Sequence, residues 1–579
     1  MKTIIQDLNE IVIAGVKKAF GTDLDSSKEY VTETNNENFG DYQSNVSFTL
    51  SKMLHKAPMD AAAALQPALE AGSIIEKMEV VKPGFINFFI SKDYLCKKIS
   101  EVDSDSELGI PDTGKGEKII VDYSSPNIAK EMHVGHLRST IIGDSIVRTY
   151  KQLGYDVIKQ NHIGDWGTQF GMLIEHLIDL GWKDSNEHTI SDLNALYKES
   201  KVKFDSDPDF AERSHLRVVK IQSGDKESID LWKALTDESK KHFGGMYQRM
   251  GVLLNDEDYC GESFYNDKLN EVAQELLNSG KAKMSNGAVC LFPQGFQGRD
   301  GEPVPLILKK SDGGFGYDAT DVTALEYRAR KLNAKKIIYV TDTRQKMHFS
   351  MLFQAARDAQ LCDDSVELTH VSFGSVLGQD GKPFKTRSGE TVTLSSLLDE
   401  AEERAKEIIL AKNPEATGDS LASLSRSIGI SAIKYADLSC DRIKDYVFNW
   451  ERMLAFDGNT APYIQNAYVR CKALVTKGEQ QGKKAEFHIL TNDDEKRLAK
   501  KCMAIGTVVQ QAAKTYEPHR LCTYLYDLAS SYHSFYEKNP VLSESDSNIL
   551  ETRLALSALV SKVLAKGMYL LGVSVIEKM

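Results

Sequence analysis

Two histidines stand three positions apart in the stretch SSPNIAKEMHVGHLRST, residues 124–140. His133 and His136 follow a β-branched run, and Gly135 lies between them. Rings at this spacing can converge on one group, and imidazole N–H donors would stabilise charge that develops on a phosphorus under attack. The glycine would let a nucleotide approach the backbone closely. The stretch predicts a phosphate site. Two such histidines also fit a structural role or a metal site, although no carboxylate or cysteine cluster is spaced to supply a third metal ligand.

A second group of charges lies far downstream, in GKPFKTRSGE. Lys382, Lys385 and Arg387 stand between Gly381 and Gly389. A mobile basic loop can close over a triphosphate and neutralise the leaving pyrophosphate as its charge builds. Taken alone, the stretch also fits a solvated basic hairpin. Together with the histidine turn, it predicts in-line attack on an α-phosphate with pyrophosphate as the leaving group.

The elements around the histidine turn follow a recognisable order. IIVDYSS (119–125) reads as a buried strand, residues 136–154 carry apolar side chains near helical spacing, and YDVIKQNHIGD (155–165) reads as a second strand. This order begins a doubly wound parallel sheet, the Rossmann-like α/β fold. In that fold the helix that follows the first strand points its unpaired N–H groups beyond the strand end, where a phosphate can bind.

The rest of the chain indicates further domains, since 579 residues exceed the usual size of one core. The N-terminal part predicts helices at 4–20 and 60–78 and a strand at 84–91. The expected divisions are a small α/β N-terminal domain at 1–105, a catalytic domain at 106–400 with a helical insertion at about 184–290, a helical connector at 401–454 and an all-α domain at 455–579.

Composition indicates an ordinary soluble protein, with 41% hydrophobic and 27% charged residues. No apolar run reaches the roughly 20 residues that span a bilayer, and acids occur too early for a secretory signal, so we expect a cytoplasmic protein with no membrane partner.

The eight cysteines are scattered without a C-x-x-C pair. This spacing predicts reduced core thiols, with neither structural zinc nor a disulfide framework.

The net charge of −12 is unevenly distributed. Residues 455–579 contain 16 Lys and Arg against 13 Asp and Glu, a local charge of +3, which leaves −15 for the remainder. Because charge acts locally, the acidic total does not exclude a nucleic-acid partner, and the small positive excess does not establish one.

Four motifs occur in one order along the chain: the histidine turn, NHIGDWGTQFGML (161–173), YDATD (317–321) and GKPFKTRSGETVTL (381–394). This set resembles the arginyl-tRNA synthetases, within the class I aminoacyl-tRNA synthetases. The resemblance extends from NFGDYQSN (38–45) to the final LLGVSVIEKM (570–579), nearly the whole chain.

The resemblance implies a two-step reaction. Arginine and ATP, the latter with Mg²⁺, would give arginyl-adenylate and pyrophosphate, and a hydroxyl of the tRNA 3′-terminal adenosine would then take the arginyl group. Like a small subset of class I enzymes, the family binds tRNA before it activates the amino acid. A monomer is the family's expectation.

The resemblance also implies roles for individual residues. Asp321 would meet the guanidinium with two parallel hydrogen bonds, which the ammonium of lysine cannot copy, although its place also fits a charge at a helix start. Arginine would be bound by Asp122, Ser125, Asn127, His136, Tyr317, Asp321 and Gln345. ATP would be bound by His133, Gly135, His136, His348 and Lys385, with His348 near the adenosine. Catalysis would fall to His133, His136, Lys130, Lys382 and Lys385.

The basic loop departs from the class I pattern K-M-S-K-S. It keeps Lys382 and Lys385 but has Pro383 and Phe384 in the middle. This variation is usual among arginyl enzymes, where a lysine just before the histidine turn is thought to share the role. Lys130 occupies that place here, where a plain surface lysine is the alternative.

The helical C-terminal region resembles the family's anticodon-binding bundle, and residues 1–105 resemble the added domain that contacts the tRNA elbow. Aromatic rings near basic side chains can stack on unpaired bases, although most aromatics at helical spacing belong to a core. The candidate tRNA contacts are Asn38, Phe39, Gln43, Tyr463, Tyr468 and Arg470.

Two other classes of protein share part of this pattern. A small-molecule nucleotidyltransferase can carry the histidine turn, but it would leave YDATD and the C-terminal helices unexplained. A non-catalytic RNA-binding paralogue would keep those helices and lose the chemistry, yet His133, His136, Lys385 and Asp321 are all present. Pyrophosphate exchange with each amino acid, with and without tRNA, separates the three.

Overall fold

The computed structural model describes residues 2–34, 37–70, 72–181, 190–382, 384 and 392–578. The chain forms two compact units. Unit 1 comprises Met1–Pro111, Ala467–Thr507 and Asp527–Ala565, and unit 2 comprises Asp112–Asn466, Val508–Tyr526 and Lys566–Met579. Within the described residues, no helix has both the length and the apolar character that crossing a membrane would require.

Unit 1 contains an antiparallel sheet in the order β1-β2-β4-β3. Its strands are β1 (Val31–Glu33), β2 (Tyr42–Ser44), β3 (Ile75–Val81) and β4 (Phe85–Ile90). The N-terminal helices are α1 (Ile4–Phe20), α2 (Val46–Leu54), α3 (Pro58–Leu65) and α4 (Lys92–Ser104). The predicted helix at 4–20 is confirmed, and α1 opens with a capping box between Thr3 and Gln6.

The predicted helix at 60–78 is wrong in its second half. Helix α3 ends at Leu65, a 3₁₀ turn covers Gln66–Ala68, and Ile75 already begins β3. Pro67 explains the end, because it has no backbone N–H to donate to the carbonyl four residues before it, although Gln66 itself keeps helical dihedral angles.

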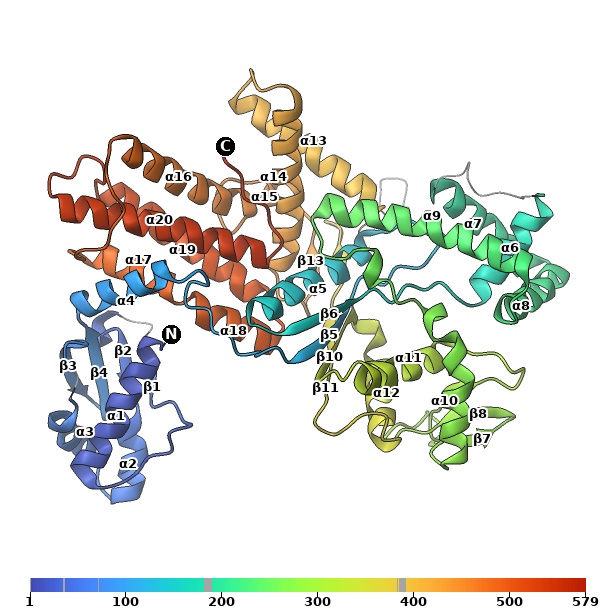
Figure 1. The fold of residues 1–579 in the computed structure, drawn as a ribbon, viewed down its shortest axis with the longest axis horizontal. Helices are drawn as coiled ribbons and strands as arrows, with labels where there is room; N and C mark the ends of the chain where they lie inside the picture. Colours follow the sequence, from blue (N-terminus) through green and yellow to red (C-terminus); the bar gives the residue numbers. More distant parts are fainter. Residues whose placement is uncertain are drawn as a thin grey trace. The chain divides into compact units, whose positions relative to one another are not determined.

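Unit 2 contains the predicted parallel sheet, in the order β11-β10-β5-β6. The strands are β5 (Lys118–Asp122), β6 (Asp156–Gln160), β10 (Lys336–Asp342) and β11 (Glu367–Phe373). Strand β5 continues through α5 (Val134–Gln152) to β6 on one side, and β10 lies on its other side (Figure 1). All four strands are parallel, but the order in which they are added to the sheet reverses between β5 and β10. Ligands bind at such a switch point, beyond the carboxyl ends of the strands.

Helices cover the sheet. Ile120, Ile337 and Tyr339 belong to one buried cluster with side chains of α10 (Asn266–Asn278), α11 (Tyr317–Glu326) and α12 (Lys346–Asp358). Helix α5 lies against the strands so closely that a Cβ on Gly143 would fall 2.3 Å from the Cβ of Tyr123. This glycine therefore sets the distance between α5 and the end of β5, and with it the position of the histidine turn.

The predicted helical insertion and helical C-terminal region are confirmed. The predicted range of about 184–290 contains α7 (Ile190–Ser206), α8 (Pro208–Gln222), α9 (Lys226–Met250) and α10, whereas α6 (Thr168–Asp179) precedes it. A small sheet of β7 (Lys283–Ser285), β8 (Ala288–Leu291) and β9 (Leu306–Lys309) begins at the end of this range. Strands β12 (Val376–Leu377) and β13 (Tyr446–Val447) pair in parallel. The later helices are α13 (Leu394–Lys412), α14 (Gly418–Leu438), α15 (Trp450–Met453), α16 (Ala461–Gln480), α17 (Asp493–Met503), α18 (Ile505–Thr515), α19 (His519–Lys538) and α20 (Ser547–Leu570).

All eight cysteines lie in described parts of the chain as free thiols. Seven are buried and Cys440 is half-buried, as expected for core thiols.

Candidate active site

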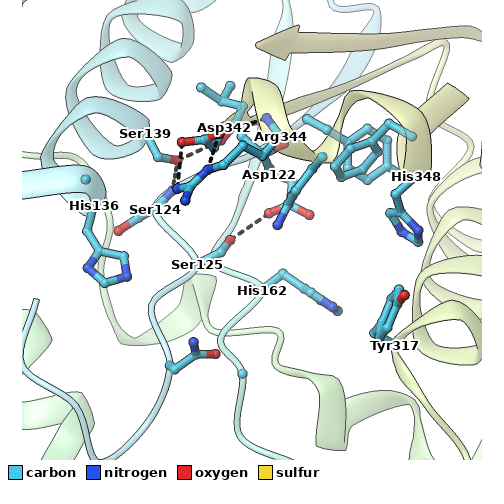
Figure 2. A pocket seen from close by; sticks show the side chains of 18 of the residues that line it. Asp122, Ser124, Ser125, His136, Ser139, His162, Tyr317, Asp342, Arg344 and His348 are labelled. Carbon is cyan, nitrogen blue, oxygen red and sulfur yellow. Dashed lines mark hydrogen bonds and ion pairs between the residues drawn. The ribbon is translucent and has the colours of Figure 1, made fainter. Parts of the chain in front are cut away.

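A pocket of about 640 Å³ lies in unit 2 beyond the carboxyl ends of β5 and β10. Figure 2 shows its side chains converging from these strand ends and from α5, α11 and α12. The structure brings together most of the residues that the sequence singled out. These are Asp122, Ser125, Asn127, His133, Gly135, His136, Tyr317, Asp321, Gln345 and His348.

The two histidines form the start of α5. His133 is the N-cap, and its Nδ1 accepts the N–H of Gly135 at 3.0 Å. The Nδ1 of His136 accepts the N–H of His133 at 3.1 Å, which completes a capping box. Because Nδ1 is the acceptor in both rings, the neutral tautomer of each carries its proton on Nε2. Each ring can therefore offer an N–H donor to a ligand.

Both imidazoles are held neutral. Burial, with a smaller effect of the positive charge that His133 can carry, lowers the pKa of His136 to about 3. Burial and the charges of Arg344 and Lys130 also lower the pKa of His133. The ring centroids are 4.0 Å apart, so a charge on one ring would oppose a charge on the other. At neutral pH these side chains can act as hydrogen-bond donors rather than as cations.

Gly135 serves the histidine turn itself. A Cβ at this position would lie 2.8 Å from Cε1 of His133, so any larger residue would push the ring away. The sequence predicts that this glycine admits a nucleotide. The structure shows that the close neighbour in the protein is the first histidine.

The turn after β5 is held in a strained conformation. Ser124 and Ser125 have φ of 73° and 47°, in the left-handed region that non-glycine residues rarely adopt. The Ser124 N–H donates to Oγ of Ser139 at 2.9 Å, and the Ser125 N–H donates to Oδ1 of Asn161 at 3.0 Å. Strain that neighbours fix in this way is typical of a functional site, and here it turns the polar side chain of Ser125 toward the pocket (Figure 2).

Asp122 is held by a buried arginine that the sequence analysis missed. Arg328 Nη2 lies 2.8 Å from Asp122 Oδ2, and both side chains are buried. The Ser125 hydroxyl donates to the other carboxylate oxygen, Oδ1, at 3.0 Å. Arg328 reaches this position from a π-helical turn, Tyr327–Lys331, that continues α11. Such turns are rare and occur often at functional sites, but sequence periodicity does not reveal them.

The opposite end of the pocket is acidic and aromatic. Asp321 Oδ2 lies 2.6 Å from His348 Nε2, and the ring of Tyr317 packs edge-on against His348 at 5.2 Å between centroids. His162 Nε2 lies 3.8 Å from Asp321 Oδ1. Although burial opposes it, the hydrogen bond to Asp321 raises the pKa of His348.

Two further lining residues were missed by the sequence analysis. Burial next to Asp321 and Asp165 raises the pKa of Glu262 to about 8, so this carboxyl is mostly protonated at neutral pH. Arg344 pairs with Asp342 through Nε at 2.9 Å and Nη2 at 3.0 Å. Both lie in 3₁₀ turns, Glu262–Tyr265 and Thr343–Gln345, and belong to none of the four motifs. A carboxyl with so high a pKa in a cleft is a recognised sign of a functional group, but only the fold reveals it.

Comparison with known proteins agrees with this geometry. Residues 98–450 match the family model for the catalytic domain of class I tRNA synthetases (R), 6–90 match the arginyl tRNA synthetase N-terminal domain, and 464–579 match the DALR anticodon-binding domain. The chain is 45% identical to the arginine–tRNA ligase of Thermobifida fusca, covering 93% of this chain and 94% of that protein. It is 42% identical to that of Shewanella amazonensis, with both chains fully covered.

The chain belongs to the arginyl-tRNA synthetase family. A crystal structure of the arginyl-tRNA synthetase from Plasmodium falciparum superimposes over the full length of both chains with a TM-score of 0.81 at 31% identity. The Thermus thermophilus arginyl-tRNA synthetase shares the fold, with a TM-score of 0.79 at 22% identity. The resemblance recognised in the four sequence motifs is thereby confirmed.

Of the lysines expected in arginyl-tRNA synthetase catalysis, Lys130 and Lys382 are not among the described residues that line the pocket. Lys130 Nζ is 4.3 Å from the centroid of Tyr197, against which it packs. Lys382 is exposed, in a turn where its N–H donates to Asp380. Lys385 lies outside the described residues. Their roles therefore remain predictions.

The residues predicted to contact tRNA differ in how much of each side chain is exposed to solvent. In unit 1, Asn38 and Phe39 are exposed, while the Gln43 amide donates to Oδ1 of Asn87 at 2.7 Å. Arg470 lies 2.9 Å from His533 Nδ1 and packs over the ring of Tyr536, which is 40% exposed. Tyr468 is buried, in keeping with the alternative of a core aromatic. In unit 2, Tyr463 is half-buried against Tyr526.

Proposed function

We propose that this pocket forms arginyl-adenylate and then passes the arginyl group to tRNA. One observation carries the proposal: the pocket joins an end that suits a guanidinium to an end that suits a phosphate. Tyr317, Asp321 and Glu262 provide the first, and the neutral imidazoles at the start of α5 provide the second. The strained turn at Ser125 lies between them, where the carboxylate of arginine would meet the α-phosphorus of ATP (Figure 2).

In the first step an oxygen of the arginine carboxylate attacks the α-phosphorus, and the bond to the bridging oxygen of pyrophosphate breaks. Negative charge grows on the oxygens of the phosphorus and on the leaving group. The Nε2–H groups of His133 and His136 would donate to the phosphoryl oxygens. The backbone N–H groups of Val134, Gly135 and His136 already donate to acceptors within the protein, so the two rings supply the donors at this helix start. Neutral donors suit this task, because they need neither gain nor lose a proton as the charge develops.

Recognition of arginine would rest on charge and shape. The Asp321 carboxylate can accept two parallel hydrogen bonds from a guanidinium, and Glu262 can lose its proton to provide a second negative charge. Tyr317 and Gln345 would complete the side-chain contacts. Asn127, Ser125 and Asp122 would bind the α-amino and carboxylate groups, with Asp122 oriented by Arg328.

In the second step a hydroxyl of the terminal adenosine of tRNA attacks the carbonyl carbon of the adenylate. AMP leaves, and the hydroxyl proton is released. We expect tRNA to be required for the first step as well. We assign the elbow contact to residues 1–105, catalysis to 106–400 and anticodon binding to 455–579, with 401–454 as connector. We also expect the protein to act as a monomer, which light scattering in solution would check.

Magnesium would arrive with ATP rather than occupy a site of the protein. Among the described lining residues, three of the four carboxylates have cationic or imidazole partners: Asp122 with Arg328, Asp342 with Arg344, and Asp321 with His348. The fourth, Glu262, is mostly protonated. These residues therefore do not form a set of oxygen ligands for a divalent cation.

Pyrophosphate exchange with each amino acid, with and without tRNA, tests the proposal. Exchange that requires both arginine and tRNA is the expected result. Lysine is the matched control, because it carries the same charge without the planar fork of the guanidinium. Exchange supported by lysine would exclude the assigned pocket, and full-rate exchange without tRNA would refute the requirement for tRNA.

A further inference from the structure

The charges that line the pocket are unequally divided. The described lining residues include four carboxyl side chains, Asp122, Glu262, Asp321 and Asp342, but Arg344 is the one lysine or arginine among them. The two histidines at the start of α5 are neutral at pH 7. If ATP binds here, as proposed above, Arg344 is the one permanently positive side chain among the described lining residues that can compensate the negative charge of the triphosphate.

Arg344 is fixed without being buried. It lies in the 3₁₀ turn Thr343–Gln345, directly after β10, and its side chain is 87% exposed. Asp342 accepts from the backbone N–H of Arg344 at 2.8 Å, from Nε at 2.9 Å and from Nη2 at 3.0 Å. No hydrogen bond from Nη1 to another described residue is found. The guanidinium is thus held along one edge while the other edge remains available.

This ion pair contributes little to the fold. An exposed pair of this kind contributes little to the free energy of unfolding, and this one joins residues only two positions apart. It does not connect separate elements. A structural role therefore gives no reason for an oriented guanidinium at this position.

Arg344 faces the histidine end of the pocket. In Figure 2 its guanidinium lies toward Ser139 and His136, whereas His348 and Tyr317 lie on the opposite side. Its charge also acts on His133, since it is one of the two cations that lower the pKa of that imidazole. The guanidinium is therefore close to the end assigned to phosphate and separate from the acidic end assigned to arginine.

We propose that Arg344 binds the β- and γ-phosphates of ATP and stabilises the pyrophosphate as it leaves. The proposal rests on the proposed function. The α-phosphorus must lie near the inner turn at Ser125 to be attacked, so the leaving phosphates extend toward solvent, where Arg344 is exposed. A guanidinium can meet two phosphate oxygens with parallel hydrogen bonds, and such bonds strengthen as charge accumulates on the leaving group. Asp342 is a positioning residue that acts through Arg344.

The first test compares ATP with AMP, which lacks the two outer phosphates. Equilibrium binding of each is measured on the full-length protein without tRNA, for wild type, Arg344→Ala and Arg344→Lys. Arg344→Ala should weaken ATP binding about 10- to 100-fold, the value of one or two charge-assisted hydrogen bonds, and should leave AMP binding unchanged. Arg344→Lys should recover part of the lost ATP affinity, because lysine keeps the positive charge but lacks the planar set of N–H donors of the guanidinium.

Arg426 provides a matched control in the same unit. Its side chain is 60% exposed on α14, and its Nε lies 3.6 Å from Glu402. Arg426→Ala should bind ATP as wild type does. Asp342→Asn, which keeps Arg344 but loosens it, should weaken ATP binding less than Arg344→Ala does.

The second test uses the KM for pyrophosphate in arginine-dependent exchange, which should rise with the KM for ATP in Arg344→Ala. Equal weakening of ATP and AMP would overturn the proposal and assign Arg344 to the nucleoside or to local structure. Unchanged ATP binding with a raised KM for tRNA would assign it to a tRNA phosphate instead. If the wild type supports no arginine-dependent exchange, the proposed function fails, while the comparison of ATP with AMP still tests Arg344.

Discussion

His348 Nε2 lies 2.6 Å from Oδ2 of Asp321, the carboxylate that we assign to the guanidinium of arginine. The hydrogen bond favours the protonated ring, so the pKa of His348 is raised above its usual value of 6.5. An imidazolium and a guanidinium would therefore compete for the same carboxylate. This relationship connects arginine binding to pH.

Arginine binding should weaken as the pH falls through the raised pKa of His348. Below that pKa the imidazolium pairs with Asp321 and must lose its proton or move before the guanidinium can bind. Above it the ring is neutral and competes less. The KM for arginine, measured from about pH 6 to 8.5, should fall with rising pH, and His348→Gln should reduce this dependence to the part that Glu262 contributes.

His242 serves as the control for that experiment. Its imidazole is half-buried on α9 and is not among the residues that line the pocket, and burial lowers its pKa. His242→Gln should keep the wild-type pH dependence. A His348→Gln profile as steep as wild type would show that the competition does not occur.

Glu262 should contribute to arginine binding only where it can ionise. Its pKa of about 8 means that it is protonated at pH 6.5 and charged at pH 9 in the protein without arginine. The guanidinium favours the charged form, so binding should release a proton near neutral pH. Calorimetry in two buffers of different ionisation enthalpy measures that proton.

The substitution Glu262→Gln separates this effect from that of His348. At about pH 9 it should raise the KM for arginine by an amount that corresponds to about 1.5–3 kcal/mol of binding free energy, the value of a hydrogen bond to a charged group. At pH 6.5 the effect should be smaller. Glu326→Gln is the control, since burial also raises the pKa of Glu326 but its partner is Arg330. A loss of equal size at both pH values would show that Glu262 is already ionised before arginine binds.

The sequence predicted the parts of the fold that local pattern determines. The strand–turn–helix–strand around the histidine turn, the helical insertion and the helical C-terminal region are confirmed because apolar periodicity and length report them directly. The helix at 60–78 was overextended because its apolar residues mask the effect of Pro67. The histidine turn, Asp321 and Tyr317 could be found because they lie in compact motifs.

The residues that were missed act through tertiary contact. Arg328 reaches Asp122 from a π-helical turn far away in the sequence, and the pKa of Glu262 depends on burial beside Asp321 and Asp165. Neither fact is encoded in spacing along the chain. Arg344 follows a strand end as many exposed arginines do, and only its place in the pocket distinguishes it.

His136→Ala should slow adenylate formation by about 2–4 kcal/mol through loss of a donor to the phosphoryl group. The side chain also accepts the His133 N–H, so the same change removes half of the capping box. His136→Asn keeps an acceptor for that N–H. His136→Asn should therefore restore the thermal unfolding midpoint of the protein, while its exchange rate remains low.

Because the pKa of His136 is about 3, its titration should cause no fall in exchange rate between about pH 6 and 8. Single-turnover formation of arginyl-adenylate, with arginine and ATP saturating, isolates this step from arginine binding. If His136→Asn forms arginyl-adenylate as fast as wild type, the imidazole takes no part in the chemistry. If its rate and its stability recover together, the side chain of His136 acts only as a helix cap.

The buried pair of Arg138 and Asp437 should fix α5 against the rest of unit 2. The Arg138 Nε lies 3.1 Å from Asp437 Oδ2, with the side chains 1% and 0% exposed. The Nη1 of Arg138 also donates to the carbonyl of Gly374 at 2.7 Å, just beyond β11. Asp437→Asn leaves the guanidinium charged and uncompensated, and breaking such a pair costs about 3–5 kcal/mol. We expect a lower thermal unfolding midpoint and, because Arg138 follows the histidine turn by two residues, slower adenylate formation.

Arg404→Ala is the comparison, since Arg404 forms an exposed pair with Glu400 one turn away on α13. It should change the midpoint little, because exposed pairs of this type contribute less than about 1 kcal/mol. Replacing both buried partners with apolar residues of similar size, Arg138→Met with Asp437→Leu, should recover part of the midpoint, since no charge then remains unpaired. The exchange rate should recover less than the midpoint, because the double variant also loses the hydrogen bond from Arg138 to the carbonyl of Gly374. A double variant with wild-type rate would show that packing alone, without the guanidinium, positions the histidines.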